Sequence, residues 1–243
     1  MFSPFADPLI GAIYLLGEPL MLSRFSRISS VFLISLSLFL PSAFAYDTDL
    51  SDTAIREAYF LGQRRDEKSG AFLANYSKHL PIPKKGPYIS EIRLLTPVAQ
   101  VVEVSSQNTA GYSAQQARLD YHGRGDFVLL EIHVEFTPTY NQIQAEHAAN
   151  SLAGEKGITL RTEDFWQDFR YGLKQKNQWV EPRSMRGEPI YAASDPYSSG
   201  GLIGAWVFIE YDARNVISEG AEIRVFLPEN LEVSATFDLS TLQ

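Results

Sequence analysis

The chain has 243 residues, a formal net charge of −8 and no cysteine. An acidic chain without a basic block is repelled by phosphate backbones, so we expect no nucleic-acid partner. The absence of cysteine excludes disulfides, thiolate metal sites and thiol catalysis.

The segment Met21 to Ala45 has the three parts of a secretory signal. Two arginines lie near its start, an apolar run follows at 31–40, and an A-x-A motif closes it. The run has ten residues, about half of the roughly 20 that a helix needs to span a bilayer. We therefore expect a signal peptide over 21–45 that is cleaved before Tyr46, with an uncleaved membrane anchor as the alternative.

Residues 1–20 fit no part of such a signal, because their apolar run is short and is broken by Gly11. Met21 stands where a signal peptide should begin, so we expect translation to start there and residues 1–20 to be a mis-called extension. An exported chain without disulfides is typical of a bacterial envelope protein. The sequence thus predicts a bacterial protein of the periplasm or the exterior, without a membrane span once the signal is cleaved.

Helical spacing dominates 46–80. Ser51 is placed as an N-cap with Ile55 on the apolar face behind it, and a second short helix is expected over 71–79. Prolines at 81–87 then form a stiff connector, which we take as the boundary to a main domain over 88–243.

The main domain is expected to be rich in strands. The clearest one is 127–136, where apolar side chains alternate with Glu131, His133 and Glu135. Thr96-Pro97 either starts a helix or bends a strand, and the pattern leaves both open. Short strands separated by turns predict a mainly β fold, an antiparallel β-sandwich of immunoglobulin-like type with an N-terminal helical segment.

Four short stretches resemble segments shared by a group of uncharacterised exported bacterial proteins. They are 87–90 (PYIS), 94–97 (LLTP), 111–116 (GYSAQQ) and 187–192 (GEPIYA). The resemblance covers most of the predicted mature chain. It implies export, and because no activity or site residue is established for that group, it implies nothing about chemistry.

Glu131, His133 and Glu135 form the densest carboxylate–imidazole group in the sequence. Alternate strand positions place all three on one face, about 7 Å from one to the next. Such a group can bind a divalent metal or make the histidine a base. The competing interpretation is the wet face of a half-exposed strand, which carries charged residues by default.

The aromatic residues Trp166, Trp179, Tyr197 and Trp206 are the better candidates for binding. They lie on or beside expected strands and the 194–201 loop. Trp206 and Phe208 point away from the apolar face of their strand, and an open aromatic face can stack on sugar rings or receive a protein. The alternative is that both faces of this strand are buried.

The sequence therefore favours a non-enzymatic binding or interaction module, with an envelope protein or a glycan as partner. The alternative is a metal-dependent or hydrolytic enzyme that uses Glu131, His133 and Glu135. A third possibility is a structural module that packs against identical copies. No cofactor-binding motif occurs in the sequence, so no cofactor is predicted.

Overall fold

The computed structural model describes residues 49–108, 110–141, 162–192, 201–228 and 231–242. The predicted signal at 21–45, the extension before it and Tyr197 lie outside these residues. Residues 43–243 form one compact unit. In the described part of the chain no helix is both long and apolar enough to cross a bilayer.

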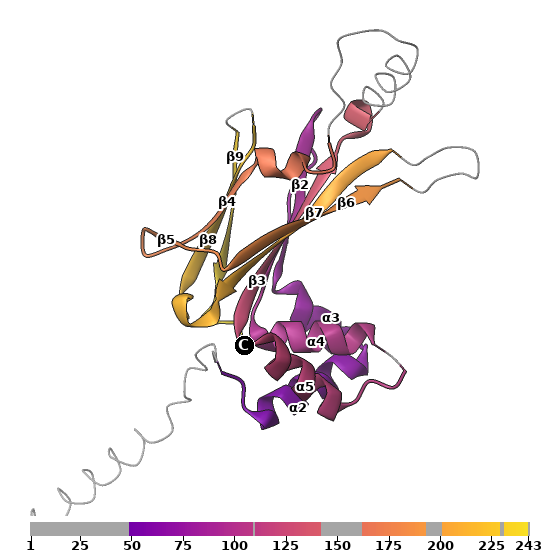
Figure 1. The fold of residues 1–243 in the computed structure, drawn as a ribbon, viewed down its shortest axis with the longest axis vertical. Helices are drawn as coiled ribbons and strands as arrows, with labels where there is room; N and C mark the ends of the chain where they lie inside the picture. Colours follow the sequence, from indigo (N-terminus) through magenta and orange to yellow (C-terminus); the bar gives the residue numbers. More distant parts are fainter. Residues whose placement is uncertain (1–48, 109, 142–161, 193–200, 229–230, 243) are drawn as a thin grey trace, which may run out of the picture. The chain divides into compact units, whose positions relative to one another are not determined.

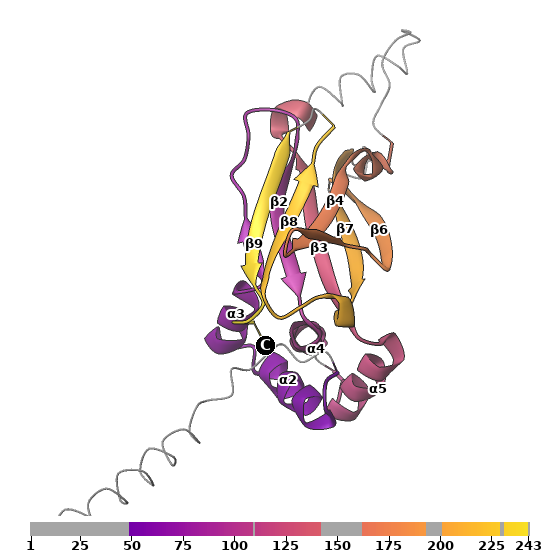
Figure 2. The same ribbon diagram turned by 90° about the vertical axis from the view of Figure 1, so that its left-hand side faces the viewer.

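Two antiparallel sheets pack face to face (Figures 1 and 2). The larger sheet has, in spatial order, β1 (Ser77–His79), β2 (Pro87–Leu95), β3 (Phe127–Phe136), β7 (Leu202–Asp212) and β6 (Ser184–Tyr191). The smaller sheet has β5 (Gln178–Val180), β4 (Arg170–Gln175), β8 (Gly220–Phe226) and β9 (Glu232–Asp238). The prediction of a mainly β antiparallel sandwich is confirmed.

Strand β3 lies at the centre of the larger sheet, with β2 on one side and β7 on the other. Its alternate residues Val128, Leu130, Ile132 and Val134 are fully buried, as the sequence pattern predicts. They belong to the same apolar cluster as Ile223 and other side chains of the smaller sheet. The core therefore fills the space between the sheets and leaves the opposite face of β3 to polar residues.

Four helices lie together at one end of the sandwich (Figures 1 and 2). They are α2 (Asp52–Arg64), α3 (Glu67–Ala74), α4 (Pro97–Gln107) and α5 (Ala114–Arg124). Ser51 caps α2 by accepting from the backbone N–H of Ala54, as predicted. A second apolar cluster, which includes Ile55 and Val102, joins α2, α4 and α5. The helix predicted near the N-terminus thus packs against two helices from the main part of the chain.

Helix α4 settles the alternative left open at Thr96-Pro97. The Thr96 hydroxyl accepts from the N–H of Ala99, and Pro97 occupies the first turn. Proline fits there because its missing N–H would have no partner within the helix. Helix α4 therefore starts directly at the end of β2 and carries its side chains to the end of the larger sheet.

Two predicted elements differ from the structure. The second helix ends at Ala74, and Ser77–His79 is strand β1, paired with Glu91–Arg93 of β2. The alternating pattern of 165–173 predicts a strand from Phe165, but residues 165–168 form a 3₁₀ helix, η2 (Phe165–Asp168), and β4 begins only at Arg170. A second 3₁₀ helix, η3 (Ala213–Asn215), follows β7. For β1 and η2, contacts with distant segments set the local structure, and the spacing of residues along the chain does not reveal these contacts.

Candidate functional site

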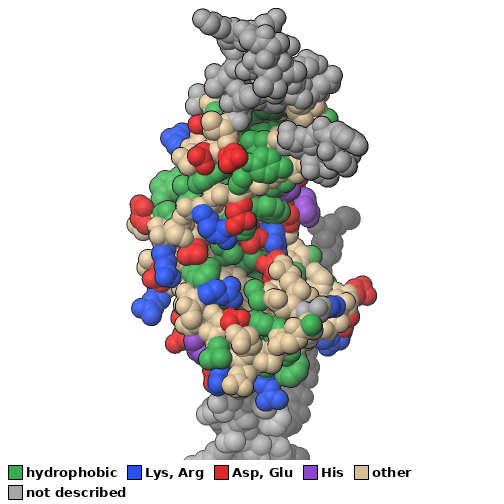
Figure 3. Space-filling model, turned by 45° about the vertical axis from the view of Figure 1, so that its right-hand side comes forward, with side chains coloured by type: hydrophobic (Ala, Val, Ile, Leu, Met, Phe, Trp, Pro, Cys, Tyr) green, Lys and Arg blue, Asp and Glu red, His purple; other side chains and the backbone are tan. Residues whose placement is uncertain are grey.

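The outer face of the larger sheet carries the residues that the sequence singled out. We call this surface, formed by outward side chains of β1, β2, β3, β7 and β6, the polar sheet face. Acidic, basic and apolar side chains are interleaved on it (Figure 3). Strand register sets its rows, and one row holds Arg93, Glu131, Phe208 and Arg186 on four successive strands.

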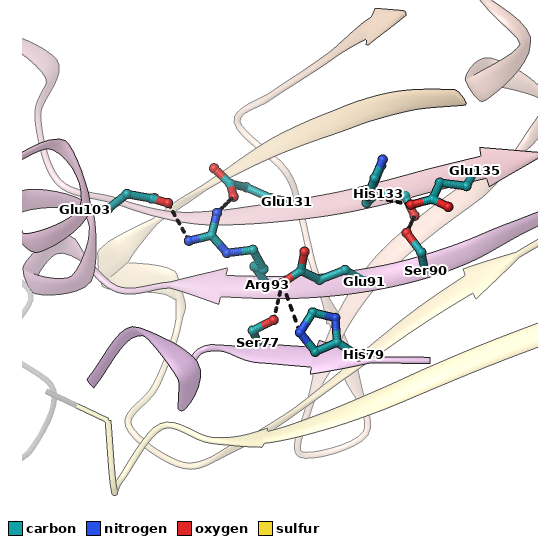
Figure 4. Close-up of polar contacts among 9 residues, drawn as sticks. All are labelled: Ser77, His79, Ser90, Glu91, Arg93, Glu103, Glu131, His133 and Glu135. Atoms are coloured by element: carbon teal, nitrogen blue, oxygen red, sulfur yellow. Dashed lines mark hydrogen bonds and ion pairs between the residues drawn. The ribbon is translucent and has the colours of Figure 1, made fainter. Parts of the chain in front are cut away.

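Arg93 is the centre of a largely buried ion cluster. Its guanidinium lies 2.5 Å from Glu131 on β3 and 2.5 Å from Glu103 on α4 (Figure 4). The side chains of Arg93 and Glu131 are only 17% and 10% exposed. The cluster joins a helix to two strands, and removing one member would leave a buried charge without its partner.

Burial raises the pKa of Glu131 to about 7; Arg93 opposes this shift, and Glu103 and Glu91 add to it. Burial also works against the charged form of Arg93, but Glu131 and Glu103 outweigh it and raise the pKa of the guanidinium. One guanidinium thus serves several carboxylates, so one of them is left poorly compensated. Glu131 is that carboxylate because it is the most buried.

Glu91 extends the cluster toward the sheet edge. It accepts a hydrogen bond from the Ser77 hydroxyl and lies 3.8 Å from Nε2 of His79 (Figure 4). Both partners come from β1, which the sequence did not predict. His79 is mostly exposed, so this contact adds little to stability.

His133 and Glu135 form a second, separate pair on β3. Nδ1 of His133 lies 3.2 Å from Oε1 of Glu135, and the Tyr88 hydroxyl donates to Oε2 of the same carboxylate over 2.7 Å. The other ring nitrogen of His133 lies on the side of the ring away from Glu135 (Figure 4). Glu135 therefore fixes the orientation of the imidazole.

Burial lowers the pKa of His133, although Glu135 and Glu91 oppose the shift. Burial also raises the pKa of Tyr88 to about 12, with the hydrogen bond to Glu135 adding to it. At neutral pH the tyrosine is therefore a donor, and the imidazole is mainly neutral.

An aromatic ladder crosses the polar sheet face next to these groups. The ring of Trp206 stacks on His133 with centroids 4.1 Å apart, and Phe208 follows at 6.4 Å. The guanidinium of Arg186 lies 4.0 Å above the Phe208 ring. The ladder fixes four side chains of β3, β7 and β6 in place, because each covers a face of its neighbour.

A hollow of about 360 Å³ opens between α4 and this ladder. Its lining includes three arginines, two glutamates, two glutamines and two aromatic rings: Arg93, Arg124, Arg186, Glu103, Glu131, Gln100, Gln107, Trp206 and Phe208. We call it the arginine hollow. It mixes apolar surface with converging hydrogen-bonding groups, as small-molecule sites do.

A second hollow, of about 330 Å³, lies beside His133 and Glu135 and is also lined by Phe136, Asn141 and Ile190. Oδ1 of Asn141 is buried there and has no hydrogen-bond partner among the described residues.

An apolar groove of about 350 Å³ lies elsewhere, between the 80–87 connector and the residues that flank the β8–β9 turn. It offers apolar burial but few directional groups, so the arginine hollow is the better candidate site.

The predicted metal trio is divided by its ion pairs. Glu131 turns to Arg93, whereas His133 and Glu135 contact each other (Figure 4). Across the described residues no three His, Asp or Glu side chains are placed to hold a metal ion. The shared strand face is as predicted, but the side chains on it serve different partners.

The predicted aromatic residues lie in three different places. Trp166 is 8% exposed and packs in the core against Gly187 rather than on the surface. Trp179 is 49% exposed on the smaller sheet, where its ring covers Gly172. Trp206 alone of the described three lines a hollow on the polar sheet face. Its strand has one buried face and one partly open face, so the alternative of two buried faces does not hold.

The sequence reasoning missed Arg93, Glu103, Arg124 and Arg186. A weak signal was available for Arg93, because it interrupts the apolar run of β2 between Ile92 and Leu94. The other three come from α4, the end of α5 and β6, and only the folded chain brings them together.

Comparisons with known proteins give no relative to reason from: no protein-family model matches the chain, and no curated protein or solved structure is significantly similar to it.

Proposed function

We propose that this is an exported binding module that holds a glycan of the cell envelope in the arginine hollow. The observation that supports the proposal is the lining of this hollow. Aromatic surface from Trp206 and Phe208 lies beside amide and charged side chains that come from α4, the end of α5 and three strands. Hydroxyl-rich rings need this combination of apolar contact and directional hydrogen bonds.

A protein partner fits the described surface less well. Stable protein interfaces bury about 800 Å² on each partner and have an apolar centre. The exposed large apolar side chains of the described residues are scattered over separate helices, strands and loops. The hollow is concave and combines polar with apolar lining residues, which suits a smaller ligand that has both kinds of surface.

Calorimetric titration of the purified protein with envelope oligosaccharides tests the proposal. Trp206→Ala should weaken binding by about threefold to tenfold, since aromatic contacts contribute about 0.5–1.5 kcal/mol. Trp179→Ala is the matched control, because it removes an exposed tryptophan from the other sheet. Equal affinities for the two variants would contradict the proposal, and so would capture of a protein partner in place of any oligosaccharide.

Export is part of this proposal and has its own test. The signal-like segment 21–45 supports it, with cleavage before Tyr46. Intact mass measured on the protein recovered from the envelope fraction should correspond to a chain that starts at Tyr46. A mass that includes residues 21–45 would instead support an uncleaved anchor.

A second candidate function is acid–base catalysis in the hollow beside His133. The observation in its favour is the order Tyr88–Glu135–His133, since a carboxylate on Nδ1 is how enzymes orient a general base. The described lining of this hollow contains no Ser, Thr or Lys that could act as nucleophile. A hydrolytic activity lost in His133→Ala but kept in His79→Ala would support this candidate over binding alone.

A further inference from the structure

We infer that the ligand of the arginine hollow carries a carboxylate, and that Arg124 and Arg186 bind it. The inference rests on the proposed function and narrows it from glycans in general to acidic saccharides. It follows from how the charges around the hollow are paired.

The three arginines of the hollow are not equivalent. Arg93 is held by Glu131 and Glu103, each at 2.5 Å, and is largely buried. Its charge is already compensated, and its donors are directed into the protein. Arg93 therefore shapes the hollow but has little left for a ligand.

Arg124 and Arg186 are available. Arg124 is exposed and has no ion-pair partner among the residues that the structure describes. Arg186 pairs with Glu188, but both side chains are more than half exposed. Such a pair contributes little in water, so an incoming carboxylate can replace Glu188 at small cost.

Arg186 is also held in position before a ligand arrives. Its guanidinium carbon lies 4.0 Å from the centre of the Phe208 ring, and this contact limits the rotation of the side chain. A planar guanidinium matches the two oxygens of a carboxylate, which would take the place that Glu188 now holds. Less conformational entropy is then lost on binding.

The local charge contrasts with that of the whole chain. Three arginines and two glutamates line the hollow, whereas the chain has a net charge of −8. An acidic protein repels anions over most of its surface, so an anion is favoured where arginine side chains can pair with it. Trp206 and Phe208 beside it provide the apolar contact for the rest of the ligand.

The experiment compares acidic oligosaccharides with their methyl esters by calorimetric titration at low salt. Oligogalacturonate, oligomannuronate and a muramic-acid disaccharide are the probes, and esterification removes the charge while it keeps the ring. We expect the acids to bind about tenfold or more tightly than the esters, with affinity that falls as salt is added.

Substitutions of single arginines test which of them bind the carboxylate. Arg124→Gln and Arg186→Gln should each weaken acid binding by about tenfold and leave ester binding unchanged. Arg186→Lys keeps the charge but not the two-pronged geometry, so it should recover only part of the loss. Arg170→Gln is the matched control, because Arg170 lies over Phe226 in the same manner on the other sheet.

The outcomes separate the two proposals. If acids and esters bind equally, and Arg124→Gln and Arg186→Gln change neither affinity, the inference of a carboxylate ligand is contradicted. The proposal of glycan binding then still stands. Binding of neither acids nor esters would overturn both. If Arg170→Gln weakens acid binding as much as Arg186→Gln does, the effect comes from the overall charge of the protein. That result would overturn the assignment of the ligand to this hollow.

Discussion

At the scale of single residues, the polar sheet face shows how one buried charge constrains its neighbours. Moving Glu131 toward His133 to build a metal site would cost Arg93 one of its two carboxylate partners inside the protein. The burial of Glu131 makes the free energy of unfolding depend on the protonation of this carboxylate, because the folded chain favours its protonated form.

The first prediction concerns Glu131 and pH. Its folded pKa of about 7 lies above the ordinary value of 4.5, so between these pH values the folded chain binds more protons than the unfolded chain. The free energy of unfolding should therefore fall as pH rises from about 4.5 to about 7, by on the order of 3 kcal/mol from this group. Above pH 7 its contribution is flat.

Glu131→Gln isolates this effect, because glutamine fills the same space and does not titrate. Denaturant unfolding at pH 5 and pH 8 should show the wild type losing stability relative to this variant as pH rises. His133 works in the opposite direction, since its lowered pKa costs stability in acid, but it is present in both proteins and cancels. Glu188→Gln, in an exposed pair, should track the wild type. A constant difference between wild type and Glu131→Gln would refute the prediction.

The second prediction concerns Gly187, which lies directly under the indole of Trp166. A Cβ added at this glycine would overlap the Trp166 ring. Gly187→Ala should therefore lower the free energy of unfolding by about 1–3 kcal/mol, because the ring must leave a well-packed site. Gly220→Ala is the control, since a Cβ there meets nothing within 4 Å. Equal stabilities for the two variants would show that Trp166 does not pack as described.

At the scale of elements, α4 connects the helices to the binding surface. It starts at Thr96, packs through Val102 against α2, and presents Glu103 to Arg93. The start of this helix therefore sets the position of one wall of the arginine hollow.

The third prediction tests that start. Thr96→Ala removes the hydroxyl that accepts from the Ala99 N–H, and this site is fully buried, so water cannot replace it. The free energy of unfolding should fall by about 1–2 kcal/mol. Ser113→Ala, at the exposed cap of α5, should cost less, and Thr96→Ser should restore most of the stability. A larger loss at Ser113 than at Thr96 would contradict this account of α4.

At the scale of the whole molecule, the sequence predicts which face of a single strand is buried. It does not predict which residues of different strands contact each other. The alternation in 127–136 located β3 and its buried face correctly, and Trp206 was correctly placed opposite Ala205 and Val207. The partners of Glu131 could not be predicted, because Arg93 reaches it through the register of β2 and β3. Trp166 was predicted to be a binding residue although it packs in the core, because nothing in its own segment reveals that Gly187 lies beneath it.

The last prediction asks whether the helices are a separate unit. The sequence predicts a boundary at the proline connector, but α2 shares an apolar cluster with α4 and α5, and Arg93 joins α4 to the sheet. These contacts should make the whole unit unfold in one step. Ile55→Ala, at a fully buried site on α2, should lower the free energy of unfolding by about 2–5 kcal/mol.

Far-ultraviolet circular dichroism follows the helices, and tryptophan fluorescence follows the sheets, because Trp166, Trp179 and Trp206 all lie outside the helices of the cluster. In Ile55→Ala both signals should shift together to the same lower midpoint. Ile223→Ala, at a fully buried site on the smaller sheet, is the matched control and should move both signals in the same way. A helical signal that melts first in Ile55→Ala, with the fluorescence midpoint unchanged, would show that the helices fold independently of the sandwich.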